Sequence, residues 1–314
     1  MTLQVGIARE HRYALVTGDY SAFEYEDGDD PEASVPVNIP AVTKIELLGD
    51  RVAVAIGGCV GLGQDFRALI RQRVKPGMDF AACESACRDV LALLEEHDCP
   101  GSEYEIEPGW IATRVGVREN GLTLILVGFN ADGSTSIAQW ANGELDSDYS
   151  NPDGCEFTIG RPFGLPLLPV AGFLPRFHAP GDDEEPASAG TAFAYLVGAH
   201  RILHALYPER VTAAGDGLLI AWNDGSPEPI RFSFDVEQLE ELVELHRSIC
   251  DRFDEEDPLP LTYELTRVER WHREGVRSAG PVLDALEAAE PLDALGDAAQ
   301  AALPDGEPAE ADAD

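Results

Sequence analysis

The chain carries a potential nucleophile, Thr2, directly after Met1. A threonine hydroxyl is a weak nucleophile and needs a nearby base to remove its proton. An α-amino group has a pKa of about 7.7–8.0, so it can accept a proton near neutral pH. Once Met1 is removed, Thr2 carries its own base, and cleavage of an amide bond is the chemistry that this arrangement suits.

Other residue types that often carry chemistry are scarce or poorly spaced. The sequence has only two lysines, Lys44 and Lys75, so each is a candidate for a specific role. Six cysteines occur without a CxxC pair, which favours reduced thiols over a zinc site. His200 and His204 stand four residues apart without a third ligand nearby, and we expect them on a helix surface. The glycine patch 57–63 lacks the spacing of a phosphate-binding loop. Taken together, these patterns lead us to expect neither a cofactor nor a metal ion.

The charge balance narrows the range of partners. Asp and Glu number 58 against 22 Lys and Arg, which gives a net charge of −36. Such a surface repels nucleic-acid phosphates and anionic lipid headgroups. No apolar run approaches the ~20 residues of a membrane span, and no signal-peptide pattern follows Met1. We expect a cytoplasmic protein without nucleic-acid or membrane partners. Its composition resembles that of halophilic haloarchaeal proteins, with a high-GC bacterial source as the alternative.

Hydrophobic periodicity and turn residues predict alternating groups of strands and helices. Strands are expected at residues 3–9 and 13–17, two within 43–58 around Gly49-Asp50, three within 109–144 with turns at Asn120-Gly121 and Asp132-Gly133, and at 217–224 and 230–234. Helices are expected at about 64–74, 79–97, 188–207, 235–254 and 258–275. Long helices beside antiparallel strands predict a layered α+β fold.

The order of these segments resembles a known family. An N-terminal hairpin, KIELLGDRVAVAIGGCVG, two helices and LTLILVGFNADG are similar to the proteasome β-subunit type of N-terminal nucleophile (Ntn) hydrolases, over roughly residues 2–225. The resemblance implies a four-layered αββα sandwich with a C-terminal helical extension. It divides the chain into an Ntn-hydrolase domain at 2–230 with an insertion at 161–190, a helical extension at 231–275 and an acidic, partly disordered tail at 276–314.

The same resemblance implies roles for individual residues. Thr2 is the nucleophile, Lys44 favours loss of its hydroxyl proton, and Asp19 holds the Lys44 ammonium. Lys44 stands fourteen residues before Gly58, the spacing found in the family. Further residues are implied in binding the oxyanion or the substrate: Gly58, Ile56, Gly57, Cys59 and Gly160. The chain departs from the family where Arg161 replaces a serine and where no aspartate stands near Arg210.

These residues predict a threonine-type amide-bond hydrolase, with a peptide or other amide as substrate. Self-association into a homo-oligomer, with a ring as one form, is implied by the resemblance. Two alternatives remain open. The chain could be a non-catalytic structural or assembly protein of the same fold, or an amidase or acyltransferase that acts on a small amide with the same Thr2.

Overall fold

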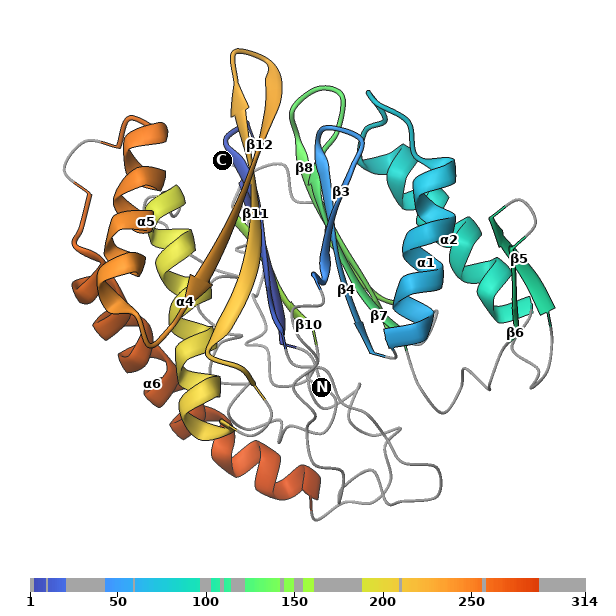
Figure 1. Ribbon diagram of the computed structural model, residues 1–314. Helices are drawn as coiled ribbons and strands as arrows, with labels where there is room; N and C mark the ends of the chain where they lie inside the picture. Colours follow the sequence, from blue (N-terminus) through green and yellow to red (C-terminus); the bar gives the residue numbers. More distant parts are fainter. Residues whose placement is uncertain are drawn as a thin grey trace, which may run out of the picture.

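Two antiparallel sheets with helices on their outer faces make up the part of the chain that the computed structural model describes (Figure 1). The described residues are 3–9, 11–20, 43–58, 60–96, 103–107, 110–113, 122–141, 144–149, 155–160, 188–208, 211–255 and 258–287. Thr2, Cys59 and residues 161–187 of the expected insertion lie outside them.

The first sheet has the strand order β10-β1-β2-β11-β12. Its strands are β1 (Gln4–Arg9), β2 (Tyr13–Asp19), β10 (Cys155–Gly160), β11 (Ala214–Asn223) and β12 (Ser226–Asp235). The expected N-terminal hairpin is confirmed, because β1 pairs with β2 in the register Val5 with Thr17. Alternation divides these strands between two cores, since Val5 and Ile7 pack toward helices whereas Ala8 packs toward the other sheet.

The second sheet has the strand order β3-β4-β7-β8-β9. Its strands are β3 (Ile45–Leu48), β4 (Val52–Gly58), β7 (Leu122–Phe129), β8 (Thr135–Ala141) and β9 (Glu144–Tyr149). The turn predicted at Gly49-Asp50 joins β3 to β4, and Gly49 has the positive φ of 69° that glycine tolerates best. The turn predicted at Asp132-Gly133 joins β7 to β8.

One predicted pairing differs from the structure. The first strand expected after residue 109 is β6 (Trp110–Thr113), and it pairs with β5 (Glu103–Glu107) in a separate two-stranded sheet. We predicted no strand at 103–107, although its alternation of Glu with Tyr and Ile is the pattern of a half-buried strand. The turn predicted at Asn120-Gly121 lies outside the described residues.

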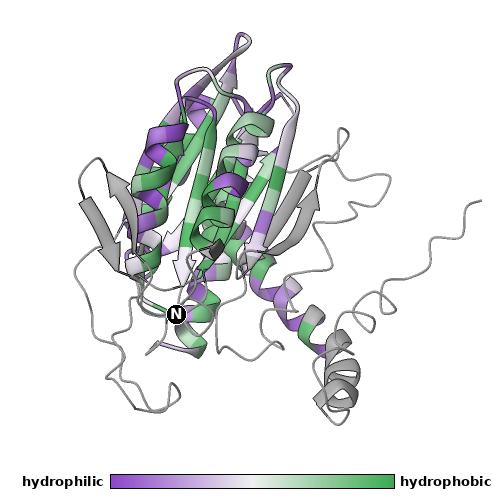
Figure 2. Cartoon of the chain, turned by 90° about the vertical axis from the view of Figure 1, so that its right-hand side faces the viewer, coloured by the Kyte–Doolittle hydropathy of each residue, from purple (hydrophilic) through white to green (hydrophobic). Residues whose placement is uncertain are grey.

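The helices pack in two groups on the outer faces of the sheets (Figure 1). The first sheet is covered by α4 (Ala189–Leu206), α5 (Leu239–Arg252) and α6 (Leu261–Glu287), and the second by α1 (Val60–Arg73) and α2 (Phe80–Glu96). Figure 2, seen from the side of α1 and α2, shows polar residues on their outward positions and apolar residues beneath. A third core of mostly small and branched residues joins the two sheets face to face.

The α+β class is therefore confirmed. The boundary predicted between residues 230 and 231 falls inside β12, and α5 and α6 share one core with α4. Helix α6 continues to Glu287, into the segment from residue 276 that was predicted as an acidic, partly disordered tail. Among the described helices, none is long and apolar enough to cross a membrane.

Candidate functional site

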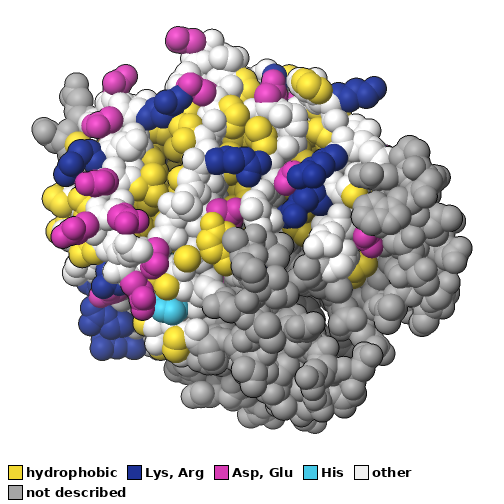
Figure 3. Space-filling model, viewed as in Figure 1, with side chains coloured by type: hydrophobic (Ala, Val, Ile, Leu, Met, Phe, Trp, Pro, Cys, Tyr) yellow, Lys and Arg dark blue, Asp and Glu magenta, His cyan; other side chains and the backbone are white. Residues whose placement is uncertain are grey.

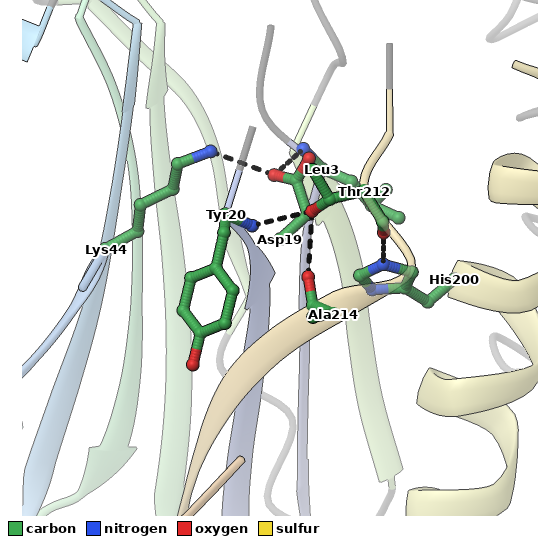
Figure 4. Close-up of polar contacts among 7 residues, drawn as sticks. All are labelled: Leu3, Asp19, Tyr20, Lys44, His200, Thr212 and Ala214. Atoms are coloured by element: carbon green, nitrogen blue, oxygen red, sulfur yellow. Dashed lines mark hydrogen bonds and ion pairs between the residues drawn. The ribbon is translucent and has the colours of Figure 1, made fainter. Parts of the chain in front are cut away.

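A buried ion pair joins the two sheets at the end where the chain begins (Figure 4). Lys44 precedes β3 and Asp19 ends β2, and the Nζ of Lys44 lies 2.9 Å from Oδ1 of Asp19. Asp19 is completely buried and Lys44 is 6% exposed. The same carboxylate oxygen accepts the backbone N–H of Leu3 at 2.9 Å. The structure thus brings Asp19 and Lys44 together beside the residue that follows Thr2.

Backbone hydrogen bonds fix both members of this pair. The N–H of Asp19 donates to the carbonyl oxygen of Leu3 at 3.1 Å, which anchors the start of the chain along β2. The N–H of Ile56 donates to the carbonyl oxygen of Lys44 at 2.8 Å, which anchors Lys44 along β4. Each charged side chain therefore projects from backbone that a neighbouring strand holds, so the pair is preorganised.

Burial and charge act in opposite directions on Lys44. Burial lowers the pKa of the Lys44 ammonium, and the charge and hydrogen bond of Asp19 together with the charge of Asp216 oppose this fall. A lysine whose pKa is lowered can release its proton more easily than an exposed one. The pair is therefore suited to adjusting the protonation of a neighbouring hydroxyl or amine.

Polar residues from α4 and the segment before β11 support the end of β2 (Figure 4). The hydroxyl of Thr212 accepts the N–H of Tyr20 at 3.0 Å and donates to the carbonyl oxygen of Ala214 at 2.8 Å. The ring of His200 lies with Nε2 2.6 Å from the carbonyl oxygen of Thr212. Because a carbonyl only accepts, Nε2 carries the proton in this contact. These bonds fix Tyr20, the residue after Asp19, to the segment that leads into β11.

Further residues expected at the site gather at the same end of the two sheets. Gly58 ends β4 with a φ of 92° and is exposed, and Gly57 pairs with Thr123 of β7. Ile56 is 5% exposed and belongs to the core under α1. Gly160 ends β10 opposite Gln4, so its backbone lies one residue along from Leu3.

A carboxyl group that the sequence did not single out also faces this region. Asp216, on β11, has a pKa raised to about 6, chiefly by burial, against the opposing charges of Arg231, Lys44 and Arg67. Its Oδ1 atom is buried and has no hydrogen-bond partner among the described residues. The only signal in the sequence was an acidic residue between two glycines, Gly215 and Gly217, at the start of a strand.

No protein-family model matches the chain, and no curated protein matches it. Among solved structures, an Anbu (Gly-1) mutant from Hyphomicrobium sp. strain MC1 is similar at 12% identity and a TM-score of 0.50, covering 81% of this chain and 96% of its own. Anbu (ancestral beta-subunit) from Yersinia bercovieri is similar at 10% identity and a TM-score of 0.51, covering 82% and 99%. The chain has an Anbu-like fold.

This likeness corrects the family predicted from the sequence. The assignment to the proteasome β-subunit type of Ntn hydrolases was wrong, because no family model matches and the similar solved structures are Anbu proteins at 10–12% identity. Short motifs such as KIELLGDRVAVAIGG describe a hairpin and a glycine turn, which many sequences of one fold can share. The likeness to Anbu proteins is one of architecture alone, and any chemistry depends on the residues of this chain.

The two histidines, His200 and His204, are less exposed than predicted. His200 was expected on a helix surface, but it is 1% exposed, and burial lowers its pKa. His204 is half-buried, and its Nδ1 lies 2.7 Å from the carbonyl oxygen of Val211. In the described part of the chain, no group of His, Cys, Asp and Glu could hold a metal ion. Cys83, Cys87 and Cys250 are free thiols in buried positions.

Proposed function

We propose that the protein is a threonine-type amide-bond hydrolase, with Thr2 as nucleophile after removal of Met1. The observation that supports this most is the buried pair of Lys44 and Asp19, which shares an oxygen with the N–H of Leu3. Leu3 directly follows Thr2 in the chain. A buried ion pair costs desolvation energy and adds little to stability, so its presence beside a hydroxyl-bearing residue favours a functional role.

The chemistry follows from these groups. The Thr2 hydroxyl attacks the amide carbon, and its proton passes to the Thr2 α-amine directly or through a water molecule. The Lys44 ammonium stabilises the developing alkoxide, and Asp19 keeps that ammonium in place. The backbone N–H of Gly58 is proposed to donate to the oxyanion. The leaving amine takes the proton as the C–N bond breaks, and water then hydrolyses the Thr2 ester.

Substrate binding is proposed at the end of β4. Gly57, Gly58 and Gly160 offer backbone without side chains, so an extended substrate can approach closely, and Cys59 is proposed to belong to the same subsite because it follows Gly58 in the chain. Ile56 packs below this edge, close to Gly63 of α1. A Cβ added at Gly63 would lie 3.1 Å from the Cγ2 of Ile56. This arrangement suits a shallow apolar subsite and a peptide-like substrate.

The stack of helices, two sheets and helices is proposed to be the four-layered αββα sandwich of Ntn hydrolases. A hydrolase of unrestricted peptide bonds needs its site shielded from folded proteins, so we also propose that the chain self-associates, with a ring as one form. Light scattering after size-exclusion chromatography in molar KCl tests this, and a mass of one chain at all concentrations would contradict it.

Activity measurements distinguish this proposal from a non-catalytic role. Fluorogenic peptides and small amides are incubated in molar KCl with the wild type and with Thr2→Ala and Thr2→Ser variants. The alanine variant should lose hydrolysis by several orders of magnitude, whereas serine, which keeps a hydroxyl, should retain part of it. Lys44→Met should also be inactive, whereas Lys75→Met, at the other lysine, should match the wild type. Equal activity in Thr2→Ala and the wild type contradicts the proposal.

A further inference from the structure

Asp216 lies next to the Lys44 stem without being bonded to it in the described structure. In the pairing of β11 with β2, Asp216 stands opposite Gly18. Residues directly opposite in antiparallel strands have Cβ atoms about 4.5–5.5 Å apart. The ideal Cβ position of Gly18 is 3.8 Å from the Cβ of Lys44. Because Gly18 has no side chain, Asp216 and the Lys44 stem are separated at this point only by the Gly18 backbone.

The same strand face carries Asp216 into the space between the sheets. Its neighbours at alternate positions, Leu218 and Ile220, belong to the core between the two sheets. Leu219, one position out of phase, packs instead against the helices. The Asp216 carboxyl therefore belongs to the layer in which the Lys44 side chain reaches from the second sheet to the first.

Basic side chains surround this layer in an otherwise acidic chain. Figure 3 shows Lys and Arg over the middle of the face that carries β12 and β3, with Asp and Glu mainly over the helices at the left. Arg231 on β12 donates to the carbonyl oxygen of Ile45 at 3.3 Å, and Arg67 on α1 donates to that of Thr43. These two arginines occupy the free edge of β3 on either side of Lys44.

The charged and titratable groups near Asp216 come from every element around it: Lys44 before β3, Arg67 on α1, Arg231 on β12 and Tyr20 after β2, with Asp19, Glu46 and His200 acting through Lys44 and Arg67. Glu46 pairs with Arg67 at 3.4 Å and also with Arg71. Asp19 is bonded to Lys44. Asp216 is the carboxyl in this group whose buried oxygen is left without a described hydrogen bond.

We propose that Asp216 is a positioning residue for Lys44: its carboxylate is a second counter-charge that stabilises the Lys44 ammonium, and acidification removes it. The inference deepens the proposed function, since Lys44 is the residue that serves Thr2 there. Asp19 holds the ammonium by a direct bond, and Asp216 sets how much negative charge surrounds it.

Two consequences follow for pH dependence. Above pH of about 6, where Asp216 is ionised, both carboxylates favour the charged form of Lys44. Below that pH, Asp216 takes up a proton and its negative charge is lost, whereas the bonded counter-charge of Asp19 is kept. Loss of Asp216 should therefore lower the pKa of Lys44, and it should move the alkaline limb of the hydrolysis profile to lower pH without a comparable rise in KM.

The test follows Lys44 itself. The full chain is labelled with ¹³C,¹⁵N-lysine and titrated in molar KCl by NMR, and its two lysines give two side-chain signals. Lys75→Arg assigns the Lys44 signal, and the exposed Lys75 is the internal control. Asp216→Asn is compared with Asp224→Asn, which lies in the exposed turn of the same hairpin at a φ of 49° that asparagine also adopts. His200→Gln separates the contribution of the histidine.

The wild-type Lys44 signal should show an inflection near pH 6. Asp216→Asn should abolish that inflection and lower the pKa of Lys44 by about one unit. Asp224→Asn and His200→Gln should keep the inflection. Absence of the inflection in the wild type overturns the inference even if the variant fails to fold, and so does its persistence in Asp216→Asn. An active Thr2→Ala protein that keeps the inflection refutes the proposed hydrolase mechanism instead, so the two failures are distinguishable.

Discussion

The Nζ of Lys44 and Oδ1 of Asp19 lie 2.9 Å apart, and both side chains are buried. The two residues come from different sheets, so the pair forms only when β2 and β3 are brought face to face. Breaking a buried pair by removing one charge leaves the other without compensation, and this costs about 3–5 kcal/mol. The pair is therefore a sensitive point for both stability and the proposed chemistry.

Asp19→Asn should lower the free energy of unfolding by about 3–5 kcal/mol, because Lys44 then lacks its bonded counter-charge. Asp89→Asn, at an exposed position of α2, makes the same chemical change and should stay within about 0.5 kcal/mol of the wild type. Urea unfolding in molar KCl measures both. Similar effects of the two variants would show that the Asp19 pair carries no special energy.

Two strand glycines should respond differently to alanine. At Gly128 an added Cβ would lie 2.5 Å from the carbonyl oxygen of Arg51 and 2.7 Å from the Cα of Val52, whereas at Gly18 the nearest atoms are 3.8 Å away. Gly128→Ala should therefore cost about 2 kcal/mol or more, and Gly18→Ala less than about 1 kcal/mol. Urea midpoints rank them, and the reverse order would mean that the second sheet is packed differently.

Acid should destabilise the protein through its buried histidines. Burial lowers the pKa of His200, His246 and His272, so the unfolded chain binds more protons than the folded one below a pH of about 6.5. This stability is present above pH 6.5 and is lost as the pH falls toward the folded pKa values. Asp216 acts in the opposite sense, because its raised pKa favours the folded state as pH falls from about 6 toward 4.

His200→Gln should therefore reduce the loss of stability between pH 7.5 and 5.5, because the variant no longer takes up a proton on unfolding at this position. Urea midpoints at several pH values give the slopes. An unchanged slope in His200→Gln would show that this histidine is protonated equally in both states.

Salt should raise the melting temperature. The net charge is −36, and its excess carboxylates repel one another most strongly at low ionic strength. The Debye length is then long, about 30 Å at 0.01 M. Melting curves between 0.01 M and molar KCl should shift steadily upward as the charges are screened. A melting temperature that is insensitive to KCl would remove the argument for salt adaptation.

Local patterns were enough to predict much of the fold. The alternation around Val5 and Val16 gave the N-terminal hairpin, and Gly49 gave the next turn, because both signals lie within a few residues. Pairing across long separations was harder to predict. The strand at 103–107 was missed although Glu alternates there with Tyr and Ile, and nothing near residues 155–160 indicated that β10 would pair with β1.

Only part of the candidate site was predicted, because the sequence shows local signals but not contacts between distant segments. Lys44 stood out because lysine is rare in this chain, and its contact with Asp19 was expected from a resemblance whose family assignment proved wrong. Asp216 and His200 were not identified, because their roles arise from burial between elements that are distant in sequence. A polar residue on a helix is normally exposed to solvent. His200 is buried because the elements packed around α4 cover it, and this packing could not be seen in the sequence.

The most direct test of the central claim is the mass of the N-terminal peptide before and after treatment with an acylating β-lactone. We expect a mature chain that starts at Thr2 and gains one acyl group on that peptide. The group should be absent from Thr2→Ala and strongly reduced in Lys44→Met. Retention of Met1, or acylation that is equally strong in Thr2→Ala, would contradict Thr2 as the nucleophile.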